Sequence, residues 1–157
     1  MSSVKKKTLY FEKGGTQNTD ALLEFVQRYA EREGIRHIVI ASTTGQTGAK
    51  ASRIFKDYDV VVVTHSYGFR EPGKSEVKQE YRKRILKNGA TICTGVHALS
   101  SVERAIRKSF STIQPLEIIA NVLRLMGEGT KVCVEITLMA ADAGLVPFDK
   151  DIIAIAG

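Results

Sequence analysis

Residues 37–48 read HIVIASTTGQTG, and this stretch decides the fold that we expect for the chain. Residues 37–41 form an unbroken apolar run, which is typical of a strand buried on both faces in a parallel sheet. Residues 42–48 are rich in glycine and hydroxyl groups, and residues 49–55 have the composition of a helix. A tight turn between a strand and a helix leaves backbone N–H groups free, and the helix dipole favours negative charge there. The stretch therefore predicts a cradle for an anionic group.

Two glycines of this turn, Gly45 and Gly48, permit unusual backbone angles, and we expect them to let a ligand approach the backbone closely. The turn does not match a P-loop, because Gly48 is followed by Ala-Lys-Ala and not by Lys-Ser or Lys-Thr. It does not match the dinucleotide fingerprint either, which needs a third glycine. The turn by itself is a generic phosphate site, and helix capping alone is an alternative explanation of its composition.

Apolar runs alternate with amphipathic segments along the rest of the 157 residues. Residues 59–64 contain four consecutive valines, which indicates a central strand buried on both faces. Strands alternating with helices favour one α/β domain over residues 1–157, with a mainly parallel sheet covered on both sides. Further strands are expected at residues 8–11, 90–94, 131–139 and 151–155.

Composition and charge limit the function classes. No apolar run is long enough to span a membrane, and no apolar core of signal-peptide length follows the basic residues 1–7, so we expect a cytoplasmic protein. The net charge of +6 is concentrated in residues 5–7 and on one face of the segment 78–87. Such a pattern is typical of a solvated face, so we expect neither a nucleic-acid partner nor membrane attachment. Cys93 and Cys133 are expected to be small buried residues inside strands.

Ligands of open parallel sheets bind beyond the carboxyl ends of the strands. The turns 42–48, 64–69, 94–100 and 140–145 are expected to meet at that edge, and they concentrate hydroxyl and imidazole side chains. The alternative is that such turns are rich in Ser, Thr and Gly for capping alone. The predicted ligand-binding residues are Ser42, Thr43, Thr44, Gly45, Gln46, Thr47, Gly48, Thr64, His65, Gly68, Phe69, Thr94, His97 and Ser100.

Three residues at this edge are candidates for catalysis: His65, His97 and Asp142. An imidazole titrates near working pH, so either histidine can act as an acid or a base. Two histidines from separate loops are more often hydrogen-bonding residues than metal ligands, so no metal site is expected.

Two further positions remain open between structural and functional roles. Glu135 is expected in the middle of the strand 131–139, where a buried carboxylate needs a partner, and a salt bridge or capping contact is favoured over catalysis. Tyr67 and Phe69 either stack on a planar ring or cover the core.

With these turns in view, the chain resembles small stand-alone microbial proteins related to the C-terminal (α/β) domain of pyruvate kinase. The resemblance implies a three-layer αβα sandwich with a mostly parallel five-stranded sheet. In pyruvate kinase the similar domain holds a phosphorylated effector at the turn after its first strand, which corresponds in position to residues 42–48. The stretches that carry the resemblance are residues 10–11, 18–19, 38–47, 60–65, 68–69, 94, 97, 99–100, 115–120, 123–124, 131–136, 139–140 and 142–145.

The resemblance also implies a ligand, flavin mononucleotide (FMN), with its phosphate at residues 43–48 and its ring toward residues 64–69 and 94–100. It implies no reaction. Relatives continue after the final strand into a further glycine-rich turn and strand, whereas this sequence ends at Gly157. We therefore expect a domain shortened at this end, with the residues that complete the pocket absent or supplied differently.

Three functions of different classes stay open. The first is a protein that binds FMN or another phosphate-bearing small molecule. The second is an enzyme that acts on a phosphorylated or carbonyl substrate through His65, His97 or Asp142. The third is a regulatory or interaction module without a small ligand, and a homo-oligomer is compatible with each of them.

Overall fold

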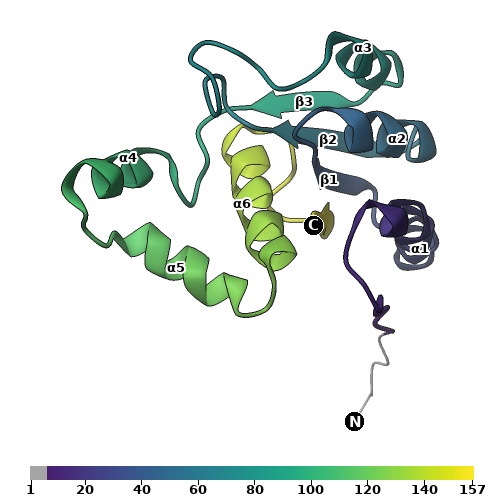
Figure 1. Ribbon diagram of the computed structural model, residues 1–157. Coiled ribbons are helices and arrows are strands. Elements are labelled where there is room, and N and C mark those ends of the chain that lie inside the picture. The colour runs from purple at the N-terminus through teal and green to yellow at the C-terminus, as the bar shows by residue number, and fades with distance from the viewer. Residues whose placement is uncertain (1–6) are drawn as a thin grey trace.

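Four parallel strands form the centre of the computed structural model, which describes residues 7–157 (Figure 1). The first six residues, including most of the predicted basic run 1–7, lie outside the described residues. The elements in chain order are a short 3₁₀ helix η1 (Thr16–Asn18), α1 (Thr19–Glu33), β1 (His37–Ala41), α2 (Gln46–Ile54), β2 (Asp59–Thr64), α3 (Gln79–Lys87), β3 (Thr91–Thr94), α4 (Ser101–Phe110), α5 (Pro115–Arg124), α6 (Glu128–Asp142) and β4 (Ile152–Ile155).

The strand order is β3-β2-β1-β4, and all neighbouring strands are parallel. Val39 of β1 is in register with Val61 of β2 on one side and with Ala154 of β4 on the other. The valines of β2 are buried, which confirms residues 59–64 as a central strand. Because every strand runs the same way, the loops that follow β1, β2 and β3 leave the sheet at one edge.

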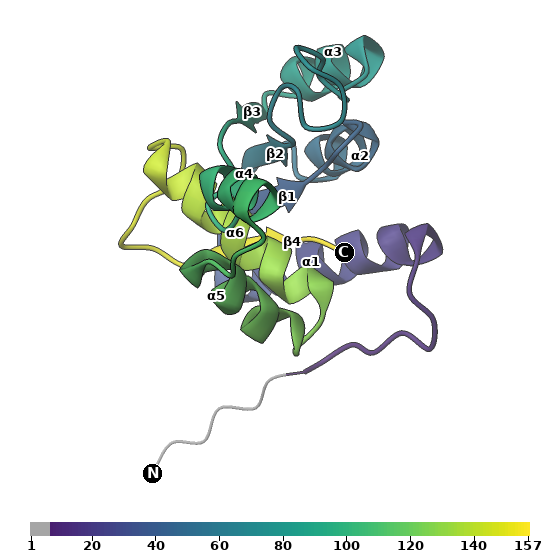
Figure 2. The same cartoon turned by 60° about the vertical axis from the view of Figure 1, so that its left-hand side comes forward.

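Each face of the sheet packs against its own set of helices. Helices α1, α2 and α3 cover one face, where Phe55 and Leu23 are fully buried against Ile40 of β1. The other face packs against α6, through Ile136 and other apolar residues of that helix. Figure 2 shows α4 and α5 on the α6 side of the sheet, and α5 packs against α6. These layers confirm the predicted three-layer αβα fold.

Two predicted strands are wrong. Residues 8–11 are exposed coil, with Tyr10 87% exposed. Without them and without residues 131–139 the sheet has four strands, where the resemblance implied five. Residues 131–139 lie inside the helix α6. The buried positions of α6 have the spacing of a helix and not the alternation of a strand; they are Lys131, Glu135, Ile136, Met139 and Ala140. The need to cover one face of the sheet overrides the β-propensity of this segment.

The two cysteines occupy different environments. Cys93 is buried in β3 as predicted, whereas Cys133 is half-buried and lies on α6, not in a strand. Both are free thiols, and burial raises the pKa of each. Within residues 7–157, no helix is long and apolar enough to cross a membrane.

Gly48 in the first turns of α2 is required by close packing against β2. A Cβ atom at this position would lie 2.5 Å from Cγ1 of Val62. Alanine normally stabilises a helix relative to glycine, but here we expect Gly48→Ala to lower the free energy of unfolding by about 1–3 kcal/mol, because the core is overpacked. Urea denaturation measures the change. Gly95→Ala is the control, since its Cβ meets no atom within 4 Å, and a loss of the same size there would contradict the packing argument.

Candidate functional site

A cavity of about 760 Å³ lies at the carboxyl edge of the sheet. The loops after β1, β2 and β3 line one side of it, and residues of α4, α5 and α6 line the other. Small-molecule sites in proteins commonly have volumes of about 300–1,000 Å³, so the cavity has the size of a metabolite or nucleotide site. Figure 1 shows β2 and β3 pointing toward this side of the molecule, where α4 lies.

Most of the residues predicted to bind a ligand line this cavity. The ten that do are Ser42, Thr43, Thr44, Gln46, Thr47, Thr64, His65, Phe69, His97 and Ser100. The predicted meeting of the loops 42–48, 64–69 and 94–100 is therefore confirmed. Four predicted ligand-binding residues and one catalytic candidate are not in the lining; they are Gly45, Gly48, Gly68, Thr94 and Asp142.

The turn after β1 presents unpartnered backbone donors. The N–H groups of Thr43, Thr44 and Thr47 have no hydrogen-bond acceptor within the part of the chain that the structure describes. Ser42 differs from them, because its Oγ accepts a hydrogen bond of 3.0 Å from the N–H of Gly48 and its own N–H donates to Val63. Ser42 therefore closes the turn, and the threonine amides remain free for an anion.

The two glycines of the turn do not offer a close approach to a ligand, so this expectation is wrong. Gly45 is buried with φ +91°, and a Cβ there would lie 2.9 Å from Cβ of Tyr81 on α3. Gly48 packs against Val62. The left-handed angle at Gly45 shapes the turn, and the missing side chains let α2 pack against α3 and β2.

Three stacked rings form the wall beside this turn. The ring of Phe69 lies 4.0 Å from that of His65 and 5.2 Å from that of His97, measured between centroids. The guanidinium of Arg104 on α4 lies 5.1 Å from the centre of the Phe69 ring, a cation–π distance. Phe69 therefore lines the cavity, stacked on His97 and tilted by 33° to His65, whereas Tyr67 is exposed and outside the lining.

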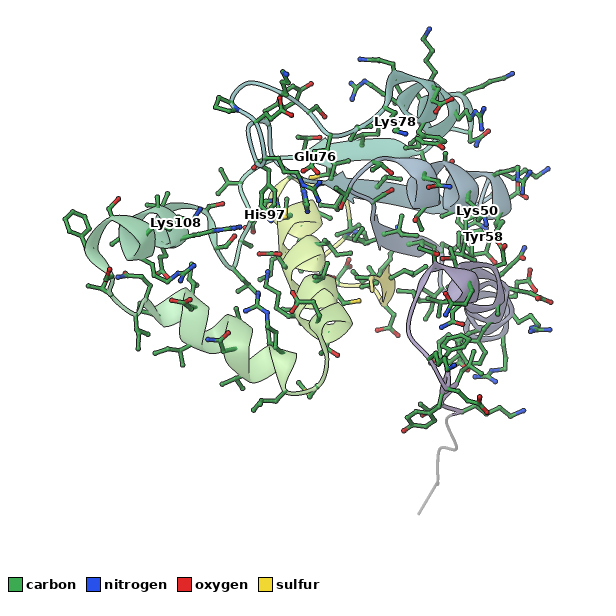
Figure 3. All side chains as sticks on the ribbon, in the orientation of Figure 1. Lys50, Tyr58, Glu76, Lys78, His97 and Lys108 are labelled. Atoms are coloured by element: carbon green, nitrogen blue, oxygen red, sulfur yellow. The ribbon has the colours of Figure 1, made fainter. Side chains whose placement is uncertain are left out.

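A carboxylate stands behind His65. Nδ1 of His65 lies 2.7 Å from Oε2 of Glu76, and Arg70 contacts the other oxygen of Glu76 at 2.9 Å. A carboxylate accepts hydrogen bonds, so this contact places a proton on Nδ1, and in the neutral ring the lone pair is then on Nε2. Among residues 7–157, Nε2 of His65 has no hydrogen-bond partner. Figure 3 labels Glu76 and His97 at the edge of the sheet that faces α4.

Both ring nitrogens of His97 contact protein groups. The N–H of Ser66 donates to Nε2 of His97 at 3.4 Å, and Nδ1 lies 3.7 Å from Oε2 of Glu135. The rings of His97 and His65 are 5.4 Å apart. His97 therefore links α6 to the loop after β2 and is less available to a ligand than His65.

Glu135 is buried and has the partners that the sequence required of it. Lys131 Nζ lies 2.6 Å from Oε2, and the N–H of Leu99 donates to Oε1 at 3.1 Å. Burial alone would raise the pKa of Glu135, but hydrogen bonds from His97 and Lys131 and the charge of Lys131 lower it to about 2. The predicted salt bridge is confirmed, on a helix and not on a strand.

A charged wall of the cavity, in which four basic residues lie among four glutamates (Glu103, Glu117, Glu128 and Glu135), was missed by the sequence analysis. Four basic residues contribute to it: Arg104, Arg107, Arg124 and Lys131. All but Arg104 form an ion pair with a carboxylate, and Arg104 has no such pair among the described residues. These residues reach the cavity from α4, α5 and α6. Because residues 131–139 were assigned to a strand, the sequence analysis did not predict these residues at the cavity.

The residues outside the lining have other surroundings. Thr94 Oγ1 lies 2.6 Å from Oγ1 of Thr64 and so holds a lining residue in place. Gly68 forms a turn with φ +76°, and its N–H donates to the carbonyl oxygen of Lys74. Asp142 is exposed at the end of α6. Because residues 131–142 are a helix that precedes a parallel strand, the loop 140–145 enters the amino edge of the sheet, and Asp142 is not part of the site.

The family whose sequence model matches this chain is described as the alpha/beta domain of pyruvate kinase. The match extends over residues 20–157. This range contains the whole sheet and all the loops and helices that line the cavity except Thr16. It agrees with the family that the sequence stretches indicated and with the α/β fold described above.

The buried pair of Glu135 and Lys131 makes stability dependent on pH. The carboxyl has a lowered pKa, so its ionisation stabilises the folded state above its ordinary value of 4.5, and this contribution is lost as the pH falls toward 2. We expect Glu135→Gln to lower the free energy of unfolding at pH 7 by about 3–5 kcal/mol, because Lys131 is left buried without a counter-charge. The difference from the wild type should shrink between pH 4.5 and pH 2, which urea denaturation at several pH values measures.

Glu128→Gln is the matched control on the same helix. Glu128 pairs with Arg124 at 2.7 Å but is 63% exposed, so its loss should change the free energy of unfolding by less than about 1 kcal/mol. Equal losses in the two variants, or a Glu135→Gln effect that does not vary with pH, would contradict this assignment.

Proposed function

The chain belongs to the family of the pyruvate kinase alpha/beta domain, and we propose that it is a binding protein for a phosphate-bearing small molecule, FMN before others. The phosphate binds at residues 43–47 and the planar ring lies toward the loops 64–69 and 94–100. The observation that carries the proposal is the set of free amides of Thr43, Thr44 and Thr47 at the cavity. Free backbone donors at a helix start are the ordinary protein ligand for phosphate.

The lining of the cavity has four glutamates and four basic residues, so the support for an anionic ligand comes from the cation without a partner in the described chain and from a helix dipole. Arg104 reaches the cavity from α4 without a carboxylate partner in the described residues, and the dipole of α2 places a partial positive charge at the turn. The hydroxyls of Thr43 and Thr47 add donors, and no protein partner within residues 7–157 uses them. A phosphate needs several donors and some positive charge, and the cavity supplies both.

The rest of the cavity supports a ligand with a flat ring. The stacked rings of His65, Phe69 and His97 present aromatic surface next to the turn. Apolar side chains of α6, such as Ile136 and Met139, line the same space. A cavity of about 760 Å³ holds both a phosphate and a ring system of this kind.

Removing one hydroxyl of the turn tests the phosphate site. Thr47→Val keeps the side-chain shape but removes the hydroxyl. We expect it to weaken FMN binding about tenfold or more, because the loss of one hydrogen bond to a charged group has an effect of this size. Its effect on riboflavin, which lacks the phosphate, should be small. Quenching of flavin fluorescence in a titration measures both dissociation constants.

Thr91→Val is the matched control, because Thr91 is exposed at the start of β3, at the opposite edge of the sheet. Its affinity for FMN should equal that of the wild type. The proposal fails if the wild type binds FMN no more tightly than riboflavin, or if Thr47→Val weakens both flavins alike.

An acid–base enzyme is the second candidate, because His65 has the geometry of a base assisted by a carboxylate. Its Nδ1 pairs with Glu76, and its free Nε2 belongs to a ring that lines the cavity. In such pairs the carboxylate orients the imidazole and stabilises its protonated form. The substrate would be a phosphorylated or carbonyl compound held by the same turn, with His65 in the catalytic role that the sequence left open.

Turnover of p-nitrophenyl phosphate and of phosphorylated ketones and aldehydes tests this candidate. We expect His65→Gln to lower any turnover by about 10²-fold or more, the usual contribution of a general base. His37→Gln is the control, because His37 pairs with Asp59 at the opposite edge of the sheet. Absence of turnover in the wild type, or equal rates in both variants, would leave ligand binding as the proposed function.

A further inference from the structure

The helices α4 and α5 carry apolar side chains that no other part of the described chain covers. Helix α4 has no buried residue, and the buried residues of α5 amount to Ala120 alone. Figure 1 shows the two helices as an arm beside α6, on the side away from α1 and α2. The exposed apolar residues of the arm are Val102, Ile106, Phe110, Ile113, Ile118, Ile119, Val122, Leu125 and Met126, which we call the outer patch.

The outer patch follows the period of the helices that carry it. On α4 the apolar positions are 102, 106 and 110, and on α5 and its last turn they are 118, 119, 122, 125 and 126. Both sets have the spacing of a helix stripe that packs against another element. Isolated exposed apolar residues are ordinary on protein surfaces, but two such stripes on adjoining helices indicate a surface that binds a protein.

The outer patch is separate from the cavity. None of its nine residues lines the cavity, whereas Glu103, Arg104 and Arg107 of the same α4 do. The charged side chains of the arm are used on the inner side, where Arg107 pairs with Glu117 at 3.1 Å. The arm therefore has a charged inner side that contributes to the site and an apolar outer side that does not.

We infer that the outer patch binds a second copy of the same chain, in a symmetric dimer that joins two arms into a four-helix bundle. The area supports this occupant: the nine residues are each 37–85% exposed, and a standard interface buries about 800 Å² per partner. Interfaces between identical subunits are also the most apolar class, which suits the nine large apolar side chains that the arm exposes.

In a dimer with a two-fold axis, the outer patch of each copy is covered by the outer patch of the other, and no further partner is needed. In such an interface the same surface occurs on both sides, so each apolar stripe meets another apolar stripe. Two helices from each copy then pack as in a four-helix bundle, with aliphatic side chains between them. The occupant expected is a copy of this chain and not a membrane, because few cations of the arm are left for lipid headgroups. Arg107 and Arg124 are paired with carboxylates and Arg104 lies over the Phe69 ring at the cavity, which leaves Lys108 as the basic residue of α4 and α5 without such a contact among the described residues.

Sedimentation velocity of the purified chain over micromolar to high micromolar concentrations tests the dimer. We expect a species of about twice the chain mass of 17.3 kDa. Leu125→Glu and Ile113→Glu, at positions 85% and 76% exposed, should raise the dimer dissociation constant at least tenfold. Because both side chains are exposed in the single chain, we expect the variants to keep the wild-type circular dichroism spectrum, and two independent positions guard against one that fails to fold.

Phe148→Glu is the matched control, since Phe148 is 98% exposed but lies outside the arm. It should sediment as the wild type does. A wild-type chain that stays monomeric throughout, or a dimer that persists in both arm variants, overturns the inference. Monomeric protein that sediments with vesicles of phosphatidylglycerol and phosphatidylcholine overturns it in favour of a membrane surface.

Discussion

A single buried carboxylate, that of Glu135, holds the two sides of the cavity together. It contacts Lys131 on its own helix and the N–H of Leu99 in the loop after β3. A buried ion pair is stable only where further contacts compensate for the loss of water. The N–H of Leu99 supplies a hydrogen bond to Glu135, and Nδ1 of His97 lies 3.7 Å from its Oε2. Because His97 also accepts from the N–H of Ser66, the loop after β2 is positioned by the same network.

The turn that we assign to phosphate takes its shape from packing within the protein. Gly45 and Gly48 are pressed against α3 and β2, and the hydroxyl of Ser42 occupies the N–H of Gly48. What remains at the cavity is a set of amides fixed in direction before any ligand arrives. Donors held in this way lose little conformational freedom on binding, so more of the interaction free energy appears as affinity.

The sequence was sufficient to predict elements whose signal is local, and insufficient to predict elements that depend on contacts with distant residues. Residues 37–48 contain a strand, a turn and a helix start in one stretch, and parallel topology then brings the three loops to one edge. Residues 8–11 have strand propensity but no neighbouring strand, and propensity alone does not form a sheet. In α6 the helical period is carried in part by Lys131 and Glu135, which a hydrophobic pattern ignores. Their spacing of four residues was the available signal, and its omission also misplaced Asp142.

The arm connects the site to its surroundings. Helix α4 is held to α5 by the Arg107–Glu117 pair and by the N–H of Leu116, which donates to Glu103. A cavity wall with no buried side chain of its own gains rigidity from whatever covers its outer side. If two arms pack together, ordering α4 for the dimer also orders Arg104 for the ligand. The conformational entropy that α4 loses in the dimer is then not lost again when the ligand binds. Linkage is reciprocal, so a ligand that contacts Arg104 would strengthen the dimer by the factor by which the dimer strengthens ligand binding.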